Sequence, residues 1–163
     1  MDAMILLVLL TLKGDGPMGV NFVEFKDIPS CEARAEQLTG ILVKGGIKVV
    51  ESPCVMGIQH FTPHRHRKTK GDKGKPAAKT KKHVYLVALD NERVLALPKR
   101  DLKACEQARA HLESKVDKGA ATRGVRYYCA LSDQVLIDDR DYEAMKRRAK
   151  RKAWEERQKH KKR

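Results

Sequence analysis

The chain has 163 residues, which suffices for one domain or for two small lobes that share a core. Hydrophobic residues make up 41% and aromatic residues 5%, while charged residues reach 34% and the formal net charge is +14. The longest apolar run, residues 4–12, is far shorter than the ~20 residues of a membrane-spanning helix, so the sequence predicts no transmembrane helix.

The run Met4–Leu12 is apolar on both faces and short, which is typical of a central strand. A degenerate export signal is the alternative interpretation, although Asp2 is acidic and no small-x-small cleavage site follows. Glycines and a proline predict a turn over residues 13–19, and Val20–Phe25 predicts a second strand that forms a hairpin with the first.

A helix is expected next. Its first N–H groups can be accepted by Asp27 or Ser30, and Gly45-Gly46 ends it. Its apolar stripe is formed by Cys31, Ala35, Leu38 and Leu42. Ile47–Val55 then predicts a third strand, so residues 1–61 form a first ββαβ unit.

The same plan follows in residues 84–138, with strands predicted at Val84–Leu89, Arg93–Leu97 and Val125–Leu131. A helix that Asp101 caps separates the second of these strands from the third. The two helix starts align without gaps at an offset of 74, and the matched positions are Lys26/Arg100, Asp27/Asp101, Ile28/Leu102, Cys31/Cys105, Glu32/Glu106, Leu38/Leu112 and Leu42/Val116. We therefore predict an α+β protein of two tandem ββαβ units that arose by internal duplication and share one core.

Two basic segments flank the second unit. Residues 62–83 form a low-complexity linker with nine Lys/Arg against one Asp, which we expect to be disordered. Residues 139–163 are expected to form a basic C-terminal helix, because the acidic residues gather at its start and the basic ones follow. Residues 62–83 and residues 140–163 each carry a net charge of +8, so the rest of the chain is close to neutral.

The four cysteines can be paired from geometry. A helix of this length rises about 20 Å and the following strand returns about 23 Å, so the cysteines at the two ends of each helix–strand hairpin meet. This favours Cys31–Cys54 and Cys105–Cys129. The alternative is that all four are reduced core residues. Paired cysteines would indicate an oxidising compartment, whereas the absence of a clear signal peptide slightly favours the cytoplasm.

No catalytic or cofactor site is predicted. The G-x-G-x-x-G match at residues 14–19 precedes a strand rather than the helix that a dinucleotide site needs. Three histidines, His60, His64 and His66, lie at the edge of the basic linker without a neighbouring carboxylate in sequence, so we predict no metal site there. Glu32 and Glu106 are explained by the helix dipole. We therefore expect a non-enzymatic protein without a cofactor.

The two basic segments point to phosphate-backbone binding. We predict that the protein binds nucleic acid or another polyanion, largely without sequence specificity. Stacking platforms are few, namely Tyr127, Tyr128, Tyr142 and Trp154. The predicted contacts are Arg65, Arg67, Lys68, Lys70, Lys79, Lys81 and Lys82 in the linker and Lys146, Arg147, Arg148, Lys150, Arg151 and Lys152 in the C-terminal helix. The alternative is an exported, disulfide-stapled structural or interaction protein of the cell envelope. The sequence does not predict an oligomeric state.

Overall fold

The computed structural model describes residues 4–63, 82–117, 124–137 and 139–161. Its helices and its mixed sheet confirm the expected α+β class. In chain order the elements are β1 (Met4–Leu12), β2 (Gly19–Phe25), α1 (Ile28–Lys44), β3 (Lys48–Glu51), β4 (Cys54–Gly57), β5 (His60–Pro63), β6 (His83–Leu89), β7 (Val94–Lys99), α2 (Leu102–Asp117), β8 (Arg126–Ser132), β9 (Gln134–Ile137) and α3 (Asp139–Lys161).

Strand β1 is the centre of the first half. It pairs antiparallel with β2 on one side and with β3 and β4 on the other. Leu6, Val8 and Leu10 face the interior of the sheet, while Leu7 packs on the outside against Cys31 and Ala35 of α1. Both faces are covered, which explains why the strand is apolar at every position from Leu6 to Leu10.

The expected third strand is divided into β3 and β4. The break falls at Ser52 and Pro53, and the carbonyl of Pro53 accepts the N–H of Val8 at 3.0 Å. Proline has no N–H to donate to the ladder, so regular pairing is interrupted there. Pairing with β1 then resumes and continues to Gly57.

The second half also has two strands followed by a helix, and then β8 and β9 where the first half has β3, β4 and β5. Strand β6 lies between β7 and β8 and pairs antiparallel with both. Its inward residues are Tyr85, Val87 and Leu89, and Leu86 packs outward in the cluster that contains Cys105 and Cys129.

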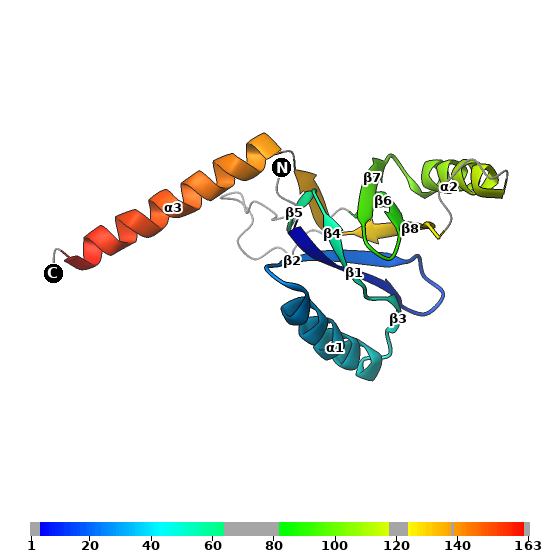
Figure 1. The fold of residues 1–163 in the computed structure, drawn as a ribbon, viewed down its shortest axis with the longest axis horizontal. Helices are drawn as coiled ribbons and strands as arrows, with labels where there is room; N and C mark the ends of the chain where they lie inside the picture. The colour runs from blue at the N-terminus through cyan, green and yellow to red at the C-terminus, as the bar shows by residue number, and fades with distance from the viewer. Residues whose placement is uncertain (1–3, 64–81, 118–123, 138, 162–163) are drawn as a thin grey trace, which may run out of the picture.

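The two halves meet at two parallel contacts, which we call the seams. At the β2–β8 seam Gly19 pairs with Leu131, whose N–H donates to the carbonyl of Met18 at 2.8 Å. At the β4–β7 seam Met56 pairs with Arg93, and the N–H of Met56 donates to the carbonyl of Glu92 at 2.8 Å. The second seam brings the edge strands together, so the sheet is rolled (Figure 1).

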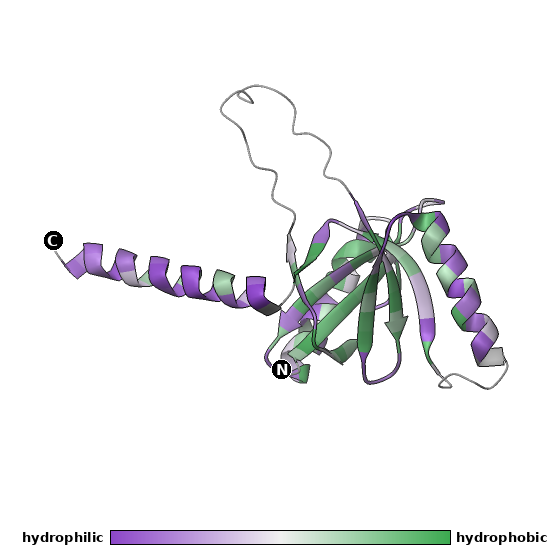
Figure 2. Ribbon diagram, turned by 90° about the horizontal axis from the view of Figure 1, so that it is seen from above, coloured by the Kyte–Doolittle hydropathy of each residue, from purple (hydrophilic) through white to green (hydrophobic). Residues whose placement is uncertain are grey.

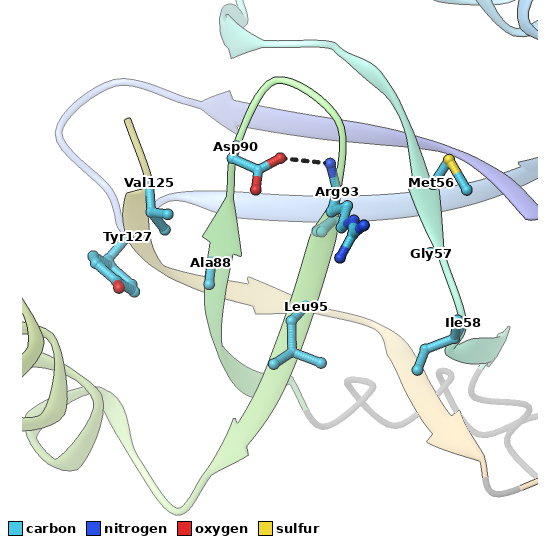
Figure 3. A pocket seen from close by; sticks show the side chains of 10 residues that line it. Met56, Gly57, Ile58, Ala88, Asp90, Arg93, Leu95, Val125 and Tyr127 are labelled. Atoms are coloured by element: carbon cyan, nitrogen blue, oxygen red, sulfur yellow. Dashed lines mark hydrogen bonds between the residues drawn. The ribbon is translucent and has the colours of Figure 1, made fainter. Parts of the chain in front are cut away.

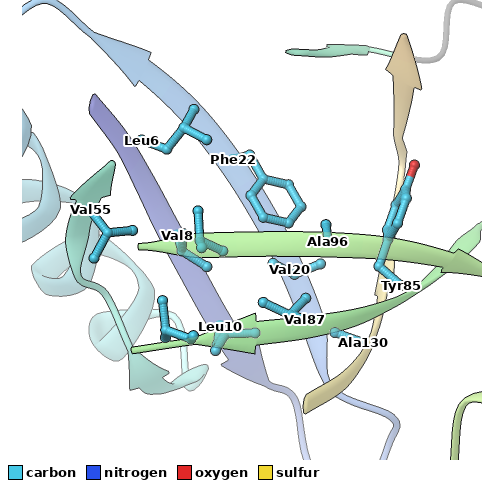
Figure 4. Close-up of a cluster of buried hydrophobic side chains, with 12 residues drawn as sticks. Leu6, Val8, Leu10, Val20, Phe22, Val55, Tyr85, Val87, Ala96 and Ala130 are labelled. Atoms are coloured by element: carbon cyan, nitrogen blue, oxygen red, sulfur yellow. The ribbon is translucent and has the colours of Figure 1, made fainter. Parts of the chain in front are cut away.

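One core fills the inside of this rolled sheet. Side chains from both halves point into it, as Figure 4 shows for Leu6, Phe22, Val55, Tyr85 and Val87. Twelve buried residues form this cluster, and α1 and α2 each cover a smaller cluster on the outside. The two halves therefore stabilise one another by burying a joint apolar surface.

Each outer helix is fixed at its start by a cap and by a cysteine pair. Asp27 accepts the N–H of Ser30, and Asp101 accepts the N–H of Ala104. Cys31 lies at disulfide distance from Cys54, with sulfurs 2.06 Å apart, and Cys105 lies 2.12 Å from Cys129. The pairing expected from helix and strand lengths is thus confirmed.

A second, two-stranded sheet joins the halves and was not expected from the sequence. His60–Pro63 (β5) pairs antiparallel with Gln134–Ile137 (β9). Its Phe61 ring stacks on Phe22 at 4.0 Å between centroids, and the Tyr85 hydroxyl donates to the carbonyl of Gln134 at 2.8 Å. This sheet covers one end of the core. It also means that the expected linker, residues 62–83, includes the end of β5 and the start of β6; residues 64–81 lie outside the described residues.

Helix α3 leaves the rolled sheet and projects away from it (Figure 1). It is hydrophilic along nearly all of its length, whereas the strands are mostly hydrophobic (Figure 2). In the described part of the chain, no helix combines the length and the apolar character needed to cross a bilayer.

Candidate nucleic-acid interface

Helix α3 carries the predicted C-terminal contacts. All six of them lie on the helix and are exposed to solvent: Lys146, Arg147, Arg148, Lys150, Arg151 and Lys152. Successive residues of an α-helix are 100° apart, so consecutive cations surround the axis instead of lying along one face. Within residues 139–161 ten Lys/Arg oppose five Asp/Glu, which gives the helix a net charge of +5.

The base of α3 is held by an aromatic contact. The Tyr142 ring stacks on His60 with centroids 3.4 Å apart, and the ammonium of Lys146 lies 4.5 Å from the Tyr142 ring centre. His60 in turn contacts the carboxylate of Glu24 on β2 at 3.0 Å. Beyond this base, residues 145–157 are all exposed, including Trp154 at 58%. The helix is therefore attached at one end and open to a partner along the rest.

Of the seven predicted linker contacts, the structure describes one. Arg65, Arg67, Lys68, Lys70, Lys79 and Lys81 lie outside the described residues. Lys82 is described, and its ammonium pairs with Asp133 at 2.7 Å. Its charge is therefore balanced by a carboxylate of the body.

Only one of the four candidate stacking residues is suited to that role. Tyr142 is occupied by His60, Tyr127 lines a groove on the outside of the sheet, and Tyr128 donates its hydroxyl to Glu51. Trp154 alone is a largely exposed ring beside basic side chains of α3. A single exposed aromatic ring fits binding to the phosphate backbone better than recognition of individual bases.

The described residues contain no group of three or more His, Cys, Asp or Glu side chains that could hold a metal ion. His64 and His66 lie outside the described residues, and His60 is engaged by Glu24 and Tyr142. Glu32 and Glu106 are exposed and lie just beyond the first turns of α1 and α2, which contain no acidic residue.

An ionic cluster lies at the edge of the rolled sheet. Arg126 binds both carboxylate oxygens of Glu51, at 2.8 and 2.9 Å, and the hydroxyl of Tyr128 donates to the same carboxylate. Burial opposes ionisation of Glu51, but the hydrogen bonds from Arg126 and Tyr128 outweigh it and lower the pKa of this carboxyl. Burial and the neighbouring carboxylate raise the pKa of Tyr128. The cluster is a structural ion pair that joins β3 to β8.

Two glutamines complete the seams, and the sequence analysis missed them. Gln134 donates to the carbonyl of Phe22 and accepts its N–H, at 2.8 and 2.7 Å. Gln59 makes the same two bonds with Ala96, at 2.8 and 2.7 Å. Each amide side chain replaces a missing strand partner beside a seam. The spacing Cys-x4-Gln after the second cysteine of both halves was the available signal.

The chain matches no protein-family model, and no curated protein or solved structure is significantly similar to it.

Proposed function

We propose that the protein is a non-enzymatic module that binds nucleic acid or a similar polyanion through α3, largely without sequence specificity. The observation that carries this proposal is a helix anchored only at its base, with exposed cations around its axis, on a body whose own charge is near neutral. At 1.5 Å per residue, 23 residues span about 35 Å, close to one turn of duplex DNA.

The cations act by releasing counterions from the phosphate backbone. Each neutralised phosphate contributes a slope of about −0.9 to the dependence of log K on log salt concentration. The six predicted linker contacts that lie outside the described residues form the second binding segment in this proposal, on their charge alone.

The test is duplex binding as a function of salt. The variant Lys146→Gln/Arg147→Gln/Lys150→Gln/Arg151→Gln removes four charges from α3, and we expect its salt slope to fall by about 3.5 relative to the unmodified chain. A matched control, Lys44→Gln/Lys48→Gln/Arg100→Gln/Lys103→Gln, removes four exposed charges from the body. We expect the control to keep its slope within about one unit. An α3 variant with an unchanged slope would remove α3 from the proposed site.

A second candidate is an exported structural or interaction protein whose basic segments meet acidic envelope components. The two cysteine pairs at disulfide distance favour it, because stable disulfides belong mainly to oxidising compartments. Thiol counting on denatured, unreduced protein from its native source separates the candidates. No free thiols would support export, and four would support a reducing compartment with nucleic acid as partner.

We also propose that the two halves descend from one duplicated ββαβ unit. The two seams support this origin, because Gly19 and Arg93 lie 74 residues apart and Met56 and Leu131 lie 75 apart, as do Gln59 and Gln134. A chain made of two copies of residues 4–63 should then form a folded, two-disulfide protein. An unfolded circular dichroism spectrum for this chain would count against the origin.

A further inference from the structure

A groove lies on the outside of the β4–β7 seam. It encloses about 560 Å³, within the range of roughly 300–1,000 Å³ typical of small-molecule sites. A row of outward side chains crosses the strands there, because Tyr127 pairs with Ala88 and Ala88 pairs with Leu95 (Figure 3). On the far side of the seam Met56 and Ile58 complete the lining. The small side chain of Ala88 leaves the hollow between its larger neighbours.

The other seam shows that the fold does not require this lining. At the equivalent position of the β2–β8 seam, Leu9 pairs with Asn21 as Ala88 pairs with Leu95, and the larger Leu9 side chain is buried. Asn21 takes the place of Leu95, and Asp133 takes that of Ile58. The β2–β8 seam is therefore filled and polar where the β4–β7 seam is hollow and apolar.

The apolar lining is unusually exposed. Met56, Ile58 and Leu95 are 47%, 50% and 42% accessible, and they lie together on one surface. Large exposed apolar patches on a soluble surface commonly mark a binding site. The cost of leaving these side chains in water is removed when an apolar ligand covers them.

One cation lies within the groove. Arg93 is exposed, and among the described residues no salt bridge involves its guanidinium. The nearby carboxylate of Asp90 is engaged by its own turn, because it accepts the N–H groups of Glu92 and Arg93 at 2.7 and 2.6 Å. In Figure 3 the Arg93 guanidinium lies between Asp90 and Gly57, above Leu95. A ligand carboxylate there would meet a guanidinium that is able to bind it bidentately.

We propose that the groove binds an amphipathic organic anion, namely an aliphatic carboxylate. Its chain lies over Ala88 and Leu95 and against Ile58, and its carboxylate pairs with Arg93. This site is separate from α3, and its ligand is a small molecule instead of a polyanion. The proposal therefore does not depend on nucleic-acid binding.

The test is an NMR titration of the full chain at constant salt with octanoate and with 1-octanol, which has the same chain without a charge. We expect shifts in the amides of Ala88, Val94 and Val125 with both ligands. Octanoate should bind at least about tenfold more tightly than 1-octanol, because only octanoate forms an ion pair with Arg93. The variant Arg93→Gln should bring octanoate to the affinity of octanol and leave octanol unchanged. Ala88→Leu should fill the hollow and abolish the binding of both ligands.

The control is Arg151→Gln, which removes one guanidinium from α3 and should leave both affinities unchanged. Core amide shifts of Val8 and Val87 report whether the Ala88→Leu variant remains folded; if it does not, Leu95→Gln replaces it and should weaken both ligands. Three results would overturn the proposal: shifts confined to α3, equal loss of octanoate binding in Arg93→Gln and Arg151→Gln, or binding that survives in a folded variant with a filled or polar groove.

Discussion

The two seams of the rolled sheet have nearly the same backbone and different side chains. Each has one parallel bridge, one N–H···O bond of 2.8 Å and one glutamine that bonds both backbone groups of a facing residue. Outside the sheet, however, the β2–β8 seam presents Asn21 and Asp133, and the β4–β7 seam presents Leu95 and Ile58. The same backbone closure thus accommodates different side chains at the outer positions of the two seams.

The largest expected effect is the loss of stability when a cysteine pair is removed, and comparing the two pairs shows whether both halves depend on them equally. The double variants Cys31→Ala/Cys54→Ala and Cys105→Ala/Cys129→Ala each open a loop of nearly equal length, with sequence separations of 23 and 24. Loop-closure entropy predicts a loss of about 3 kcal/mol for each. Urea denaturation measures both. A difference above about 1.5 kcal/mol would show that the halves are not equivalent in stability.

The next effect concerns the glutamines. Gln134→Leu leaves the N–H and carbonyl of the buried Phe22 without their partners, and Gln59→Leu does the same to the buried Ala96. We expect each to cost about 2 kcal/mol, because a buried polar group left unbonded loses its solvation. Amide hydrogen exchange separates them: protection should fall at Phe22 in the first variant and at Ala96 in the second. Equal loss at both sites in either variant would mean that the seams open together.

The smallest effect is the pH dependence of the contact between β3 and β8. The pKa of Glu51 is lowered in the folded protein, so its contribution to stability is present above the ordinary glutamate range and is lost as the pH falls through the folded pKa. Glu51→Gln should remove that part of the pH dependence and cost about 1 kcal/mol at neutral pH. Unfolding measured from pH 7 to pH 3 checks this. Parallel profiles for the two proteins would show that Glu51 does not titrate in this way.

The sequence determined the local elements. The α+β class follows from its periodicities, and β1 spans the same residues that its apolar run predicts, Met4–Leu12. The sequence predicted Asp101 as one cap and left Asp27 and Ser30 open for the other, which the structure assigns to Asp27. The two cysteine pairs followed from the fixed rise per residue of a helix and a strand. The expected strand Ile47–Val55 ran across Ser52 and Pro53, where the structure divides it, although the proline there signals an interruption of the ladder.

Tertiary structure alone decided the seams, the β5–β9 sheet and the groove. Gln134 meets Phe22 from 112 residues away, and Gln59 meets Ala96 from 37 away. The repeated Cys-x4-Gln spacing marks the two glutamines, but it does not say which backbone each one bonds, because that depends on how the distant strands pair. The groove is likewise the product of one small residue, Ala88, between side chains that three other segments bring beside it. Strand pairing, which periodicity does not specify, determined which residues share that surface.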